Sequence, residues 1–224
     1  MKNTFKVLGI IGLLLVIGFS MAACGGDDGG GSGGSGGSSG GGNIVSGVTV
    51  TYPAGIADAD KPIDFSFVYN GRTAIPISNY INEPASVTIS GGKLNIKLGT
   101  PKDQYLVESN SQSDVTVTPS DAKIFAREEF ICFTTADAKY FLICMKNTSA
   151  GASLAYADKD VTIKGTRQYS KGEFETWNAS LKKGWNYLIN SGGEKGSIGN
   201  YTSSVSLPSG FTWTLLDEAG LASL

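Results

Sequence analysis

Histidine is absent from the 224-residue chain, and cysteine occurs only at Cys24, Cys132 and Cys144. The absence of histidine excludes Ser-His-Asp triads and Cys-His nucleophile pairs, because both use an imidazole as the general base. It also excludes most zinc sites, because histidine and cysteine are the main zinc ligands in proteins. We therefore predict no catalytic residues, no metal site and no cofactor, and expect a protein that is not an enzyme.

Basic residues are also fewer than acidic ones. Loss of residues 1–23 would remove Lys2 and Lys6 and no acidic residue, which leaves 16 basic and 20 acidic residues and a net charge of about −4. A mildly acidic surface is unlike the basic patches that bind nucleic acid or anionic membranes. We therefore expect no nucleic-acid partner.

The apolar run at residues 7–19 is too short to be a transmembrane helix. It has 13 residues, whereas a membrane-spanning helix needs about 20. Lys2 and Lys6 precede the run and small residues follow it, which is the order of a secretory signal peptide. The sequence therefore predicts a signal peptide over residues 1–23.

The residues Met21-Ala22-Ala23-Cys24 resemble the lipobox of bacterial lipoproteins, in which an aliphatic residue and two small residues precede an invariant cysteine. The resemblance implies that the Cys24 thiol receives a diacylglycerol and that its new amino group is acylated after cleavage. Two or more chains, at about 0.8 kcal/mol per buried methylene, give stable membrane anchoring. Because Gly25 and not aspartate follows the cysteine, the implied location is the outer membrane rather than the inner one, facing the periplasm or the surface. The alternative is an ordinary cut after Ala23 that leaves a free thiol.

Residues 25–42 are glycine and serine apart from Asp27 and Asp28. Such a composition cannot bury apolar surface and stays unfolded, with a root-mean-square span of roughly 20–25 Å. We expect residues 24–43 to be the lipidated cysteine and a flexible tether, and residues 44–224 to be one folded domain.

Residues 44–224 alternate apolar and polar side chains with period two, and Gly, Asn and Pro separate the alternating segments. This pattern is typical of antiparallel β-strands, and no segment carries a helical stripe. About ten short strands predict an all-β fold, an antiparallel β-sandwich of immunoglobulin-like or transthyretin-like type. Besides three hairpins, strands are expected at residues 48–52, 63–69, 115–118, 161–164, 201–206 and 211–216.

The first hairpin is expected at residues 86–98. Gly91 and Gly92 form a two-residue turn that accepts positive φ, and outward pairing sets Val87 opposite Ile96. All cross-strand pairs on this face are apolar, so the face is predicted to lie in the core.

The second hairpin is expected at residues 176–189, with residues 182–184 as its loop. Outward pairing sets Trp177 opposite Ile189 on an apolar face and leaves Asn186 in water. The aromatic residues on the apolar face are Trp177, Trp185 and Tyr187. They could form a sugar-binding platform, but their shared face with aliphatic residues favours the core.

The third hairpin is expected at residues 128–146. Its register sets Cys132 opposite Cys144, and directly paired strand positions can approach the Cα separation that a disulfide needs. In an exported protein this predicts a disulfide. The alternative is two reduced cysteines that pack as small apolar residues.

The same hairpin carries apolar residues on both faces, including Phe130, Tyr140 and Leu142. Such a strand pair is either central in a covered sheet or displays a binding patch. If it is a binding patch, it is the candidate site for a partner.

Two pairs of acidic residues are candidate sites as well. Glu173 and Glu175 lie two apart and could share a strand face, as glycosidase carboxylates do, but a solvated strand end is favoured. Asp58 and Asp60 could suggest calcium, yet the other ligands that a calcium loop needs are not in position.

The segments at residues 181–186 (LKKGWN) and 207–213 (LPSGFTW) resemble phrases of uncharacterised, spirochaete-type lipoproteins. The resemblance implies a shared β domain. The favoured function is a lipid-anchored binding module with a protein or glycan ligand, and the alternatives are a carboxylate-dependent envelope glycosidase and a structural spacer.

Overall fold

The computed structural model describes residues 43–51, 66–69, 73–82, 85–108, 114–126, 130–134, 139–147, 150–170, 172–192, 197–217 and 219–220. The predicted signal peptide, the lipid-attachment residue Cys24, the tether, and Asp58 and Asp60 lie outside these residues.

The described residues form sixteen β-strands and two short 3-10 helices, so the predicted all-β class is confirmed. The 3-10 helices are η2 (Ile77–Asn79) and η3 (Asp103–Tyr105). The strands are β1 (Asn43–Thr51), β2 (Ser66–Tyr69), β3 (Thr73–Pro76), β4 (Ser86–Ser90), β5 (Lys93–Lys97), β6 (Val107–Glu108), β7 (Val115–Thr118), β8 (Lys123–Ala126), β9 (Phe130–Thr134), β10 (Lys139–Asn147), β11 (Ala150–Ala157), β12 (Val161–Ser170), β13 (Glu173–Leu181), β14 (Gly184–Ser191), β15 (Ser197–Ser204) and β16 (Thr212–Asp217).

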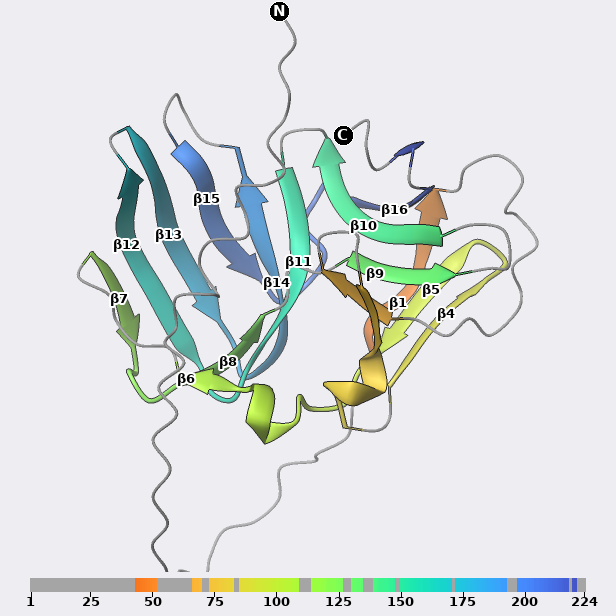
Figure 1. Ribbon diagram of the computed structural model, residues 1–224, viewed down its shortest axis with the longest axis horizontal. Coiled ribbons are helices and arrows are strands. Elements are labelled where there is room, and N and C mark those ends of the chain that lie inside the picture. Colours follow the sequence, from red (N-terminus) through yellow and green to blue (C-terminus); the bar gives the residue numbers. More distant parts are fainter. Residues whose placement is uncertain are drawn as a thin grey trace, which may run out of the picture.

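The strands are hydrogen-bonded in the order β4-β5-β1-β16-β10-β11-β14-β15-β13-β12-β7. Most pairs are antiparallel, and the exceptions are β1 with β16 and β13 with β15. β9 joins β10 to β2 and β3, while β8 pairs with both β11 and β6. Figure 1 shows two halves, with β7, β12, β13, β15 and β14 on the left and β10, β9, β1, β5 and β4 on the right.

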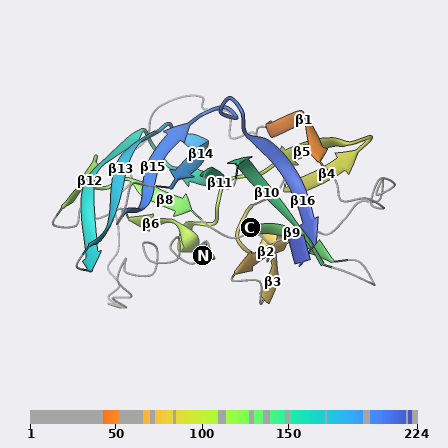
Figure 2. The same ribbon diagram turned by 90° about the horizontal axis from the view of Figure 1, so that it is seen from above.

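The left half is a curled sheet with the strand order β7-β12-β13-β15-β14-β11-β8, which forms an arch when seen from above (Figure 2). One apolar cluster contains Val117 from β7, Leu188 from β14 and Ala157 from β11. Because strands from both ends of the order contribute to it, the sheet curls around this cluster. We call the face that it covers the concave face.

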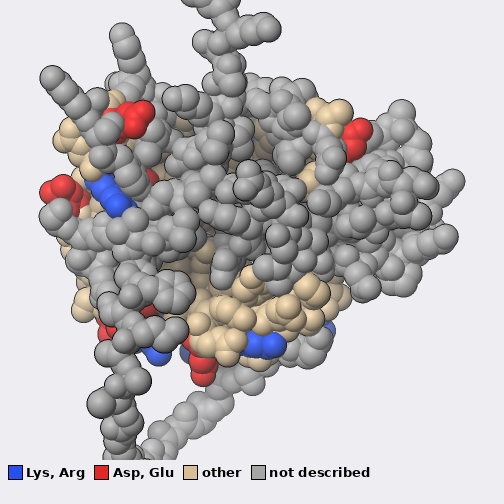
Figure 3. Space-filling model, viewed as in Figure 1, with Lys and Arg blue, Asp and Glu red and all other residues tan. Residues whose placement is uncertain are grey.

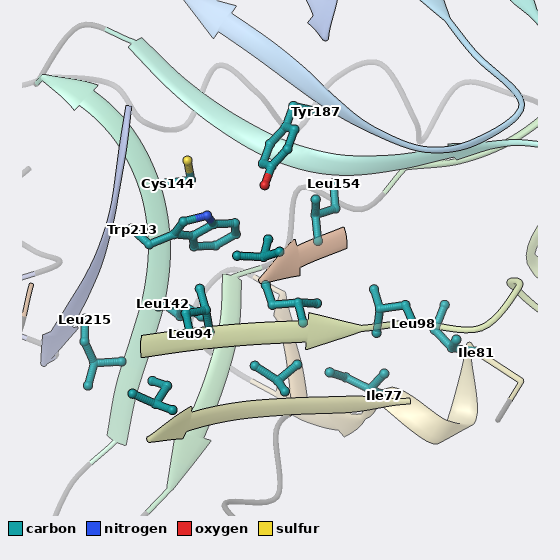
Figure 4. Packing of buried hydrophobic residues seen from close by; sticks show 14 of the residues in the cluster. Ile77, Ile81, Leu94, Leu98, Leu142, Cys144, Leu154, Tyr187, Trp213 and Leu215 are labelled. Atoms are coloured by element: carbon teal, nitrogen blue, oxygen red, sulfur yellow. The ribbon is translucent and has the colours of Figure 1, made fainter. Parts of the chain in front are cut away.

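A second cluster lies on the other face of β11 and β14, where the β4-β5 hairpin packs. This cluster contains Leu94 and Ile96 from the hairpin, Trp213 from β16 and Tyr187 from β14. Figure 4 shows Leu94, Trp213 and Tyr187. Since Tyr187 and Leu188 are adjacent and enter different clusters, β14 is buried on both faces.

The predicted first hairpin is confirmed. Val87 pairs with Ile96, and the turn residues Gly91 and Gly92 have φ values of 53° and 73°. Burial alternates along β5, so its apolar face lies in the core as expected.

The predicted second hairpin is wrong, because β15 lies between β13 and β14. Trp177 of β13 pairs with Tyr201 of β15, which pairs in turn with Asn190 of β14. Trp177 therefore aligns with Asn190 instead of Ile189. In a strand this shift of one residue moves every side chain of β14 to the opposite face.

The shift in register explains two further differences. Trp177 and Tyr187 are 5% and 2% exposed, so the core interpretation is confirmed, but they belong to different clusters. Asn186 was expected in water and is 1% exposed. It accepts from the Lys182 N–H at 2.9 Å and donates to the Lys182 and Gly184 carbonyls at 2.8 and 2.9 Å.

The predicted register of the third hairpin is also wrong. Cys132 pairs with Phe141, while Cys144 lies opposite Ala152 on one side and Trp213 on the other. The pairing of Thr134 with Lys139 sets a register three residues away from the predicted one, and the neighbour of β10 at Cys144 is β11 instead of β9. Cys144 is a buried free thiol, so the predicted disulfide does not form and the reduced, buried alternative holds for this cysteine.

The candidate partner patch is wrong for Leu142, which is 2% exposed and lies in the core. β10 has β16 along one edge and β9 and β11 along the other, so it is central, and Phe141 and Ile143 on its other face are buried too. The covered interpretation is therefore confirmed for β10. The side chains of Phe130 and Tyr140 lie outside the described residues.

Candidate functional site

The two carboxylates singled out in the sequence have different environments. Glu173 is exposed at the start of β13, whereas Glu175 is 1% exposed on the concave face. The prediction of a solvated strand end is therefore confirmed for Glu173 and wrong for Glu175. A buried carboxylate requires polar neighbours, because burial of an isolated charge is costly.

Polar residues gather around Glu175 at one end of the concave face. Glu175 pairs with Arg167 of β12 on one side and with Gly199 of β15 on the other. The next row across the strands contains Trp177, Tyr201 and Asn190. We call this group the polar end of the concave face; its members are Arg167, Glu175, Trp177, Asn190 and Tyr201.

Deeper rows of the same face are apolar. Ile163 pairs with Ala179, and Val161 pairs with Leu181, and all four are buried. The concave face thus changes from apolar to polar toward the start of β13. This change confines hydrogen-bonding chemistry to one end of the curled sheet.

The aromatic rings of the polar end are held by their strands. Trp177 and Tyr201 are stacked with ring centroids 4.0 Å apart and planes 6° apart.

Gly165, opposite Trp177, has φ of +138°, and a Cβ there would lie 2.0 Å from the Asp114 carbonyl oxygen. The close approach of Asp114 therefore requires glycine at this position.

Gly199 makes room for the polar groups on the other side. An added Cβ would lie 2.7 Å from Asn190 Oδ1 and 3.1 Å from Tyr201 Cε2. Glycine thus allows the Asn190 amide and the Tyr201 ring to lie against the β15 backbone.

Trp177 Nε1 and Asn190 Oδ1 are buried at this end and have no hydrogen-bond partner among the described residues. A buried donor or acceptor left unpaired costs about 1–3 kcal/mol. One is a donor and the other an acceptor, and they lie in the same row of the sheet.

The polar end offers a buried carboxylate, a guanidinium, an indole N–H and an amide as hydrogen-bonding groups. Within the part of the chain that is described, no three acidic or cysteine residues converge to hold a metal ion. Glycosidases need a second carboxylate beside the first, and Glu173, two residues earlier, is exposed to solvent.

Cys144 is not a candidate nucleophile. Burial raises the pKa of its thiol to about 12, and the thiolate is the reactive form. It lies near Tyr187, whose pKa burial likewise raises to about 12 (Figure 4).

Comparison with known proteins gives no relative. No family model, curated protein or solved structure matches the chain. Within the described residues, no helix has the length and apolarity to cross a membrane.

The sequence carried a signal for part of the polar end. Glu175 has the same strand parity as Trp177, Ala179 and Leu181, so its position on the buried face could have been read from the alternation. Asn190 and Tyr201 could not have been found in this way, because their place beside Trp177 depends on the insertion of β15.

Proposed function

We propose that this chain is a lipid-anchored protein of the cell envelope, of spirochaete-type lipoprotein character, whose β domain is a binding module without catalytic activity. The observation that carries the proposal is the lipobox resemblance of Met21-Ala22-Ala23-Cys24 after a basic and apolar leader. Outer-membrane attachment, facing the periplasm or the surface, is the proposed location.

The arrangement of the domain fits such an anchor. The Gly/Ser stretch ends at residue 42, and β1 begins at Asn43, at the lower side in Figure 1. β12 ends and β13 begins at the upper side, so the polar end points away from the start of β1. A tether attached there would leave this end of the domain facing away from the membrane.

We also propose that the domain is a β-sandwich variant. The support is the packing of the β4-β5-β1 sheet on β16, β10, β11 and β14 around one shared cluster. Two sheets that pack face to face around one core define that architecture.

Lipidation is tested by expression of the full chain in a bacterium that processes lipoproteins, with labelled palmitate in the medium. Label and membrane retention are expected for the native chain and for Cys144→Ser, and both should be lost in Cys24→Ser. Equal labelling of Cys24→Ser, or no label in any chain, contradicts the anchor.

Binding is tested by a glycan array and by a pull-down from envelope extracts. A saturable ligand in either assay, without turnover, supports the binding module. Silence in both together with turnover in substrate profiling rejects it.

A second candidate function, an envelope glycosidase, rests on the burial of Glu175 beside Arg167. Glu175→Gln should then abolish an activity while the domain remains folded. Retained activity in a folded Glu175→Gln protein excludes this role.

A further inference from the structure

The concave face offers a recognition site that is independent of the predicted partner patch on β10. The site is the polar end, which combines two opposite charges, two stacked rings and an amide on four adjacent strands. We propose that the polar end binds a neutral, polyhydroxylated ligand, the terminal unit of a glycan, through Trp177 Nε1 and Asn190 Oδ1. This inference rests on the proposed binding function and names its ligand class.

The hydrogen-bonding groups select the ligand chemistry. Trp177 Nε1 is a donor that needs an acceptor, and Asn190 Oδ1 is an acceptor that needs a donor. A hydroxyl group is both, so a ligand with several adjacent hydroxyl groups matches both atoms. A purely apolar ligand would leave both atoms unpaired at the cost that burial imposes.

The charges favour a ligand without net charge. Arg167 and Glu175 lie directly opposite each other on β12 and β13, so their formal charges are balanced at this end. Figure 3 shows both acidic and basic side chains at its upper left, over the region of β7, β12 and β13. An anionic or cationic ligand would meet a like charge as well as an opposite one.

The faces of the two stacked rings are not available as a platform on which a sugar could stack. Trp177 and Tyr201 are 5% and 2% exposed, and each ring covers a face of the other. The ligand would therefore contact the indole through its N–H edge. Arg167 and Asn190 are partly exposed, and they form the accessible rim on either side of buried Glu175.

Entry requires some opening of this rim, because Glu175, Trp177 and Tyr201 are buried in the structure. When only a fraction of molecules is open, the apparent affinity falls by that fraction. Weak binding to single sugars is the expected result, so the assay must detect weak complexes.

The test uses the full chain and a panel of neutral sugars: glucose, galactose, mannose, N-acetylglucosamine, lactose, cellobiose and chitobiose. Glucuronic acid and glucosamine serve as charged comparators. Binding is measured by saturation-transfer NMR and by titration calorimetry. At least one neutral sugar should bind in preference to both charged ones.

Two variants locate the binding. Trp177→Phe keeps an aromatic ring and removes the N–H, and Asn190→Ala removes the amide. Each should weaken binding about tenfold, the effect of one lost hydrogen bond. Trp213→Phe, the same change in the other cluster, and Asn178→Ala, an exposed asparagine on β13, should leave binding unchanged. Circular dichroism and thermal unfolding establish that each variant is folded.

The inference is overturned if no sugar of the panel binds, if a charged comparator binds best, or if folded Trp177→Phe and Asn190→Ala bind as well as the native chain. None of these results affects palmitate labelling at Cys24 or a protein captured from envelope extracts. Failure of the glycan site is therefore distinguishable from failure of the proposed function.

Discussion

Asn186 provides a sharp test of the strand arrangement. Its side chain makes three hydrogen bonds to the backbone of the short connection between β13 and β14, with Lys182 N–H, Lys182 carbonyl and Gly184 carbonyl at 2.9, 2.8 and 2.9 Å. It is 1% exposed, and it lies where Gly184 takes a φ of 99°. Asn186→Ala removes all three bonds without direct contact with the polar end.

The expected destabilisation of Asn186→Ala follows from the number of hydrogen bonds that are lost. At about 1 kcal/mol net for each hydrogen bond, the loss in unfolding free energy is about 3 kcal/mol. With a urea m value of about 2 kcal/mol/M, the unfolding midpoint should fall by about 1.5 M. Asn186→Asp separates hydrogen bonding from packing, because it keeps the volume and one acceptor but sets a carboxylate oxygen against two carbonyls.

The assay is urea unfolding followed by tryptophan fluorescence, with Asn178→Ala as the control at an exposed position of β13. Asn186→Ala and Asn186→Asp should both be strongly destabilised, and the control should differ little from the native chain. If Asn186→Ala matches the control, the side chain does not hold this connection. If Asn186→Asp is as stable as the native chain, lost volume and not lost hydrogen bonds explains the effect of alanine.

Three further predictions concern other positions. Gly165→Ala should cost about 1–3 kcal/mol of unfolding free energy, because the residue has a φ of +138° and its Cβ would lie 2.0 Å from the backbone carbonyl oxygen of Asp114. Gly151→Ala, with its nearest atom at 3.8 Å, should cost little in the same urea experiment. Burial raises the pKa of the Cys144 thiol from 9.0 to about 12. Below about pH 9 this thiol should not change the unfolding free energy. Between about pH 9 and about pH 12 the unfolding free energy should fall, since only the unfolded chain loses the thiol proton in that range. Unfolding of Cys144→Ala at about pH 8 and about pH 11 should show a smaller fall than the native chain, and an equal fall contradicts the assignment. Trp185→Phe should cost about 1 kcal/mol through the lost 3.0 Å hydrogen bond to the Gly99 carbonyl, and an unchanged thermal midpoint would show that this bond does not contribute.

Local pattern was enough for the first hairpin and for the all-β class. Gly91 and Gly92 accept positive φ without strain, so the turn and hence the pairing of Val87 with Ile96 depend only on neighbouring residues. Period-two alternation likewise placed Trp177 and Leu181 on a buried face, because parity within one strand needs no knowledge of its partners.

Pairing between distant segments could not be read in the same way. Residues 182–184 are typical of a hairpin loop, yet β15 enters between β13 and β14 and displaces their register by one residue. The burial of β14 does not distinguish the two arrangements, since Tyr187 on one face and Asn186 and Leu188 on the other are all buried.

In the candidate site, too, local sequence predicted single residues, and the pairing of distant strands decided their neighbours. Glu175 was visible in the sequence as an acid near the start of a strand, and only the register with β12 and β15 brought Arg167 and Gly199 beside it. Cys132 and Cys144 were assigned to facing positions, whereas the register of β9 with β10 pairs Cys132 with Phe141 and leaves Cys144 beside β11.

The sequence by itself determined the all-β character and the tight Gly-Gly turn, and it predicts the exported, lipid-anchored start of the chain. These features depend on residues close together in the chain, through side-chain parity, glycine φ and composition. Only the tertiary structure decided which strands are neighbours, that Cys144 is a free buried thiol, and that Glu175, Trp177 and Asn190 share one end of a concave face. Strand neighbours are chosen by the burial of whole faces across the domain, and a shift of one residue reverses every face.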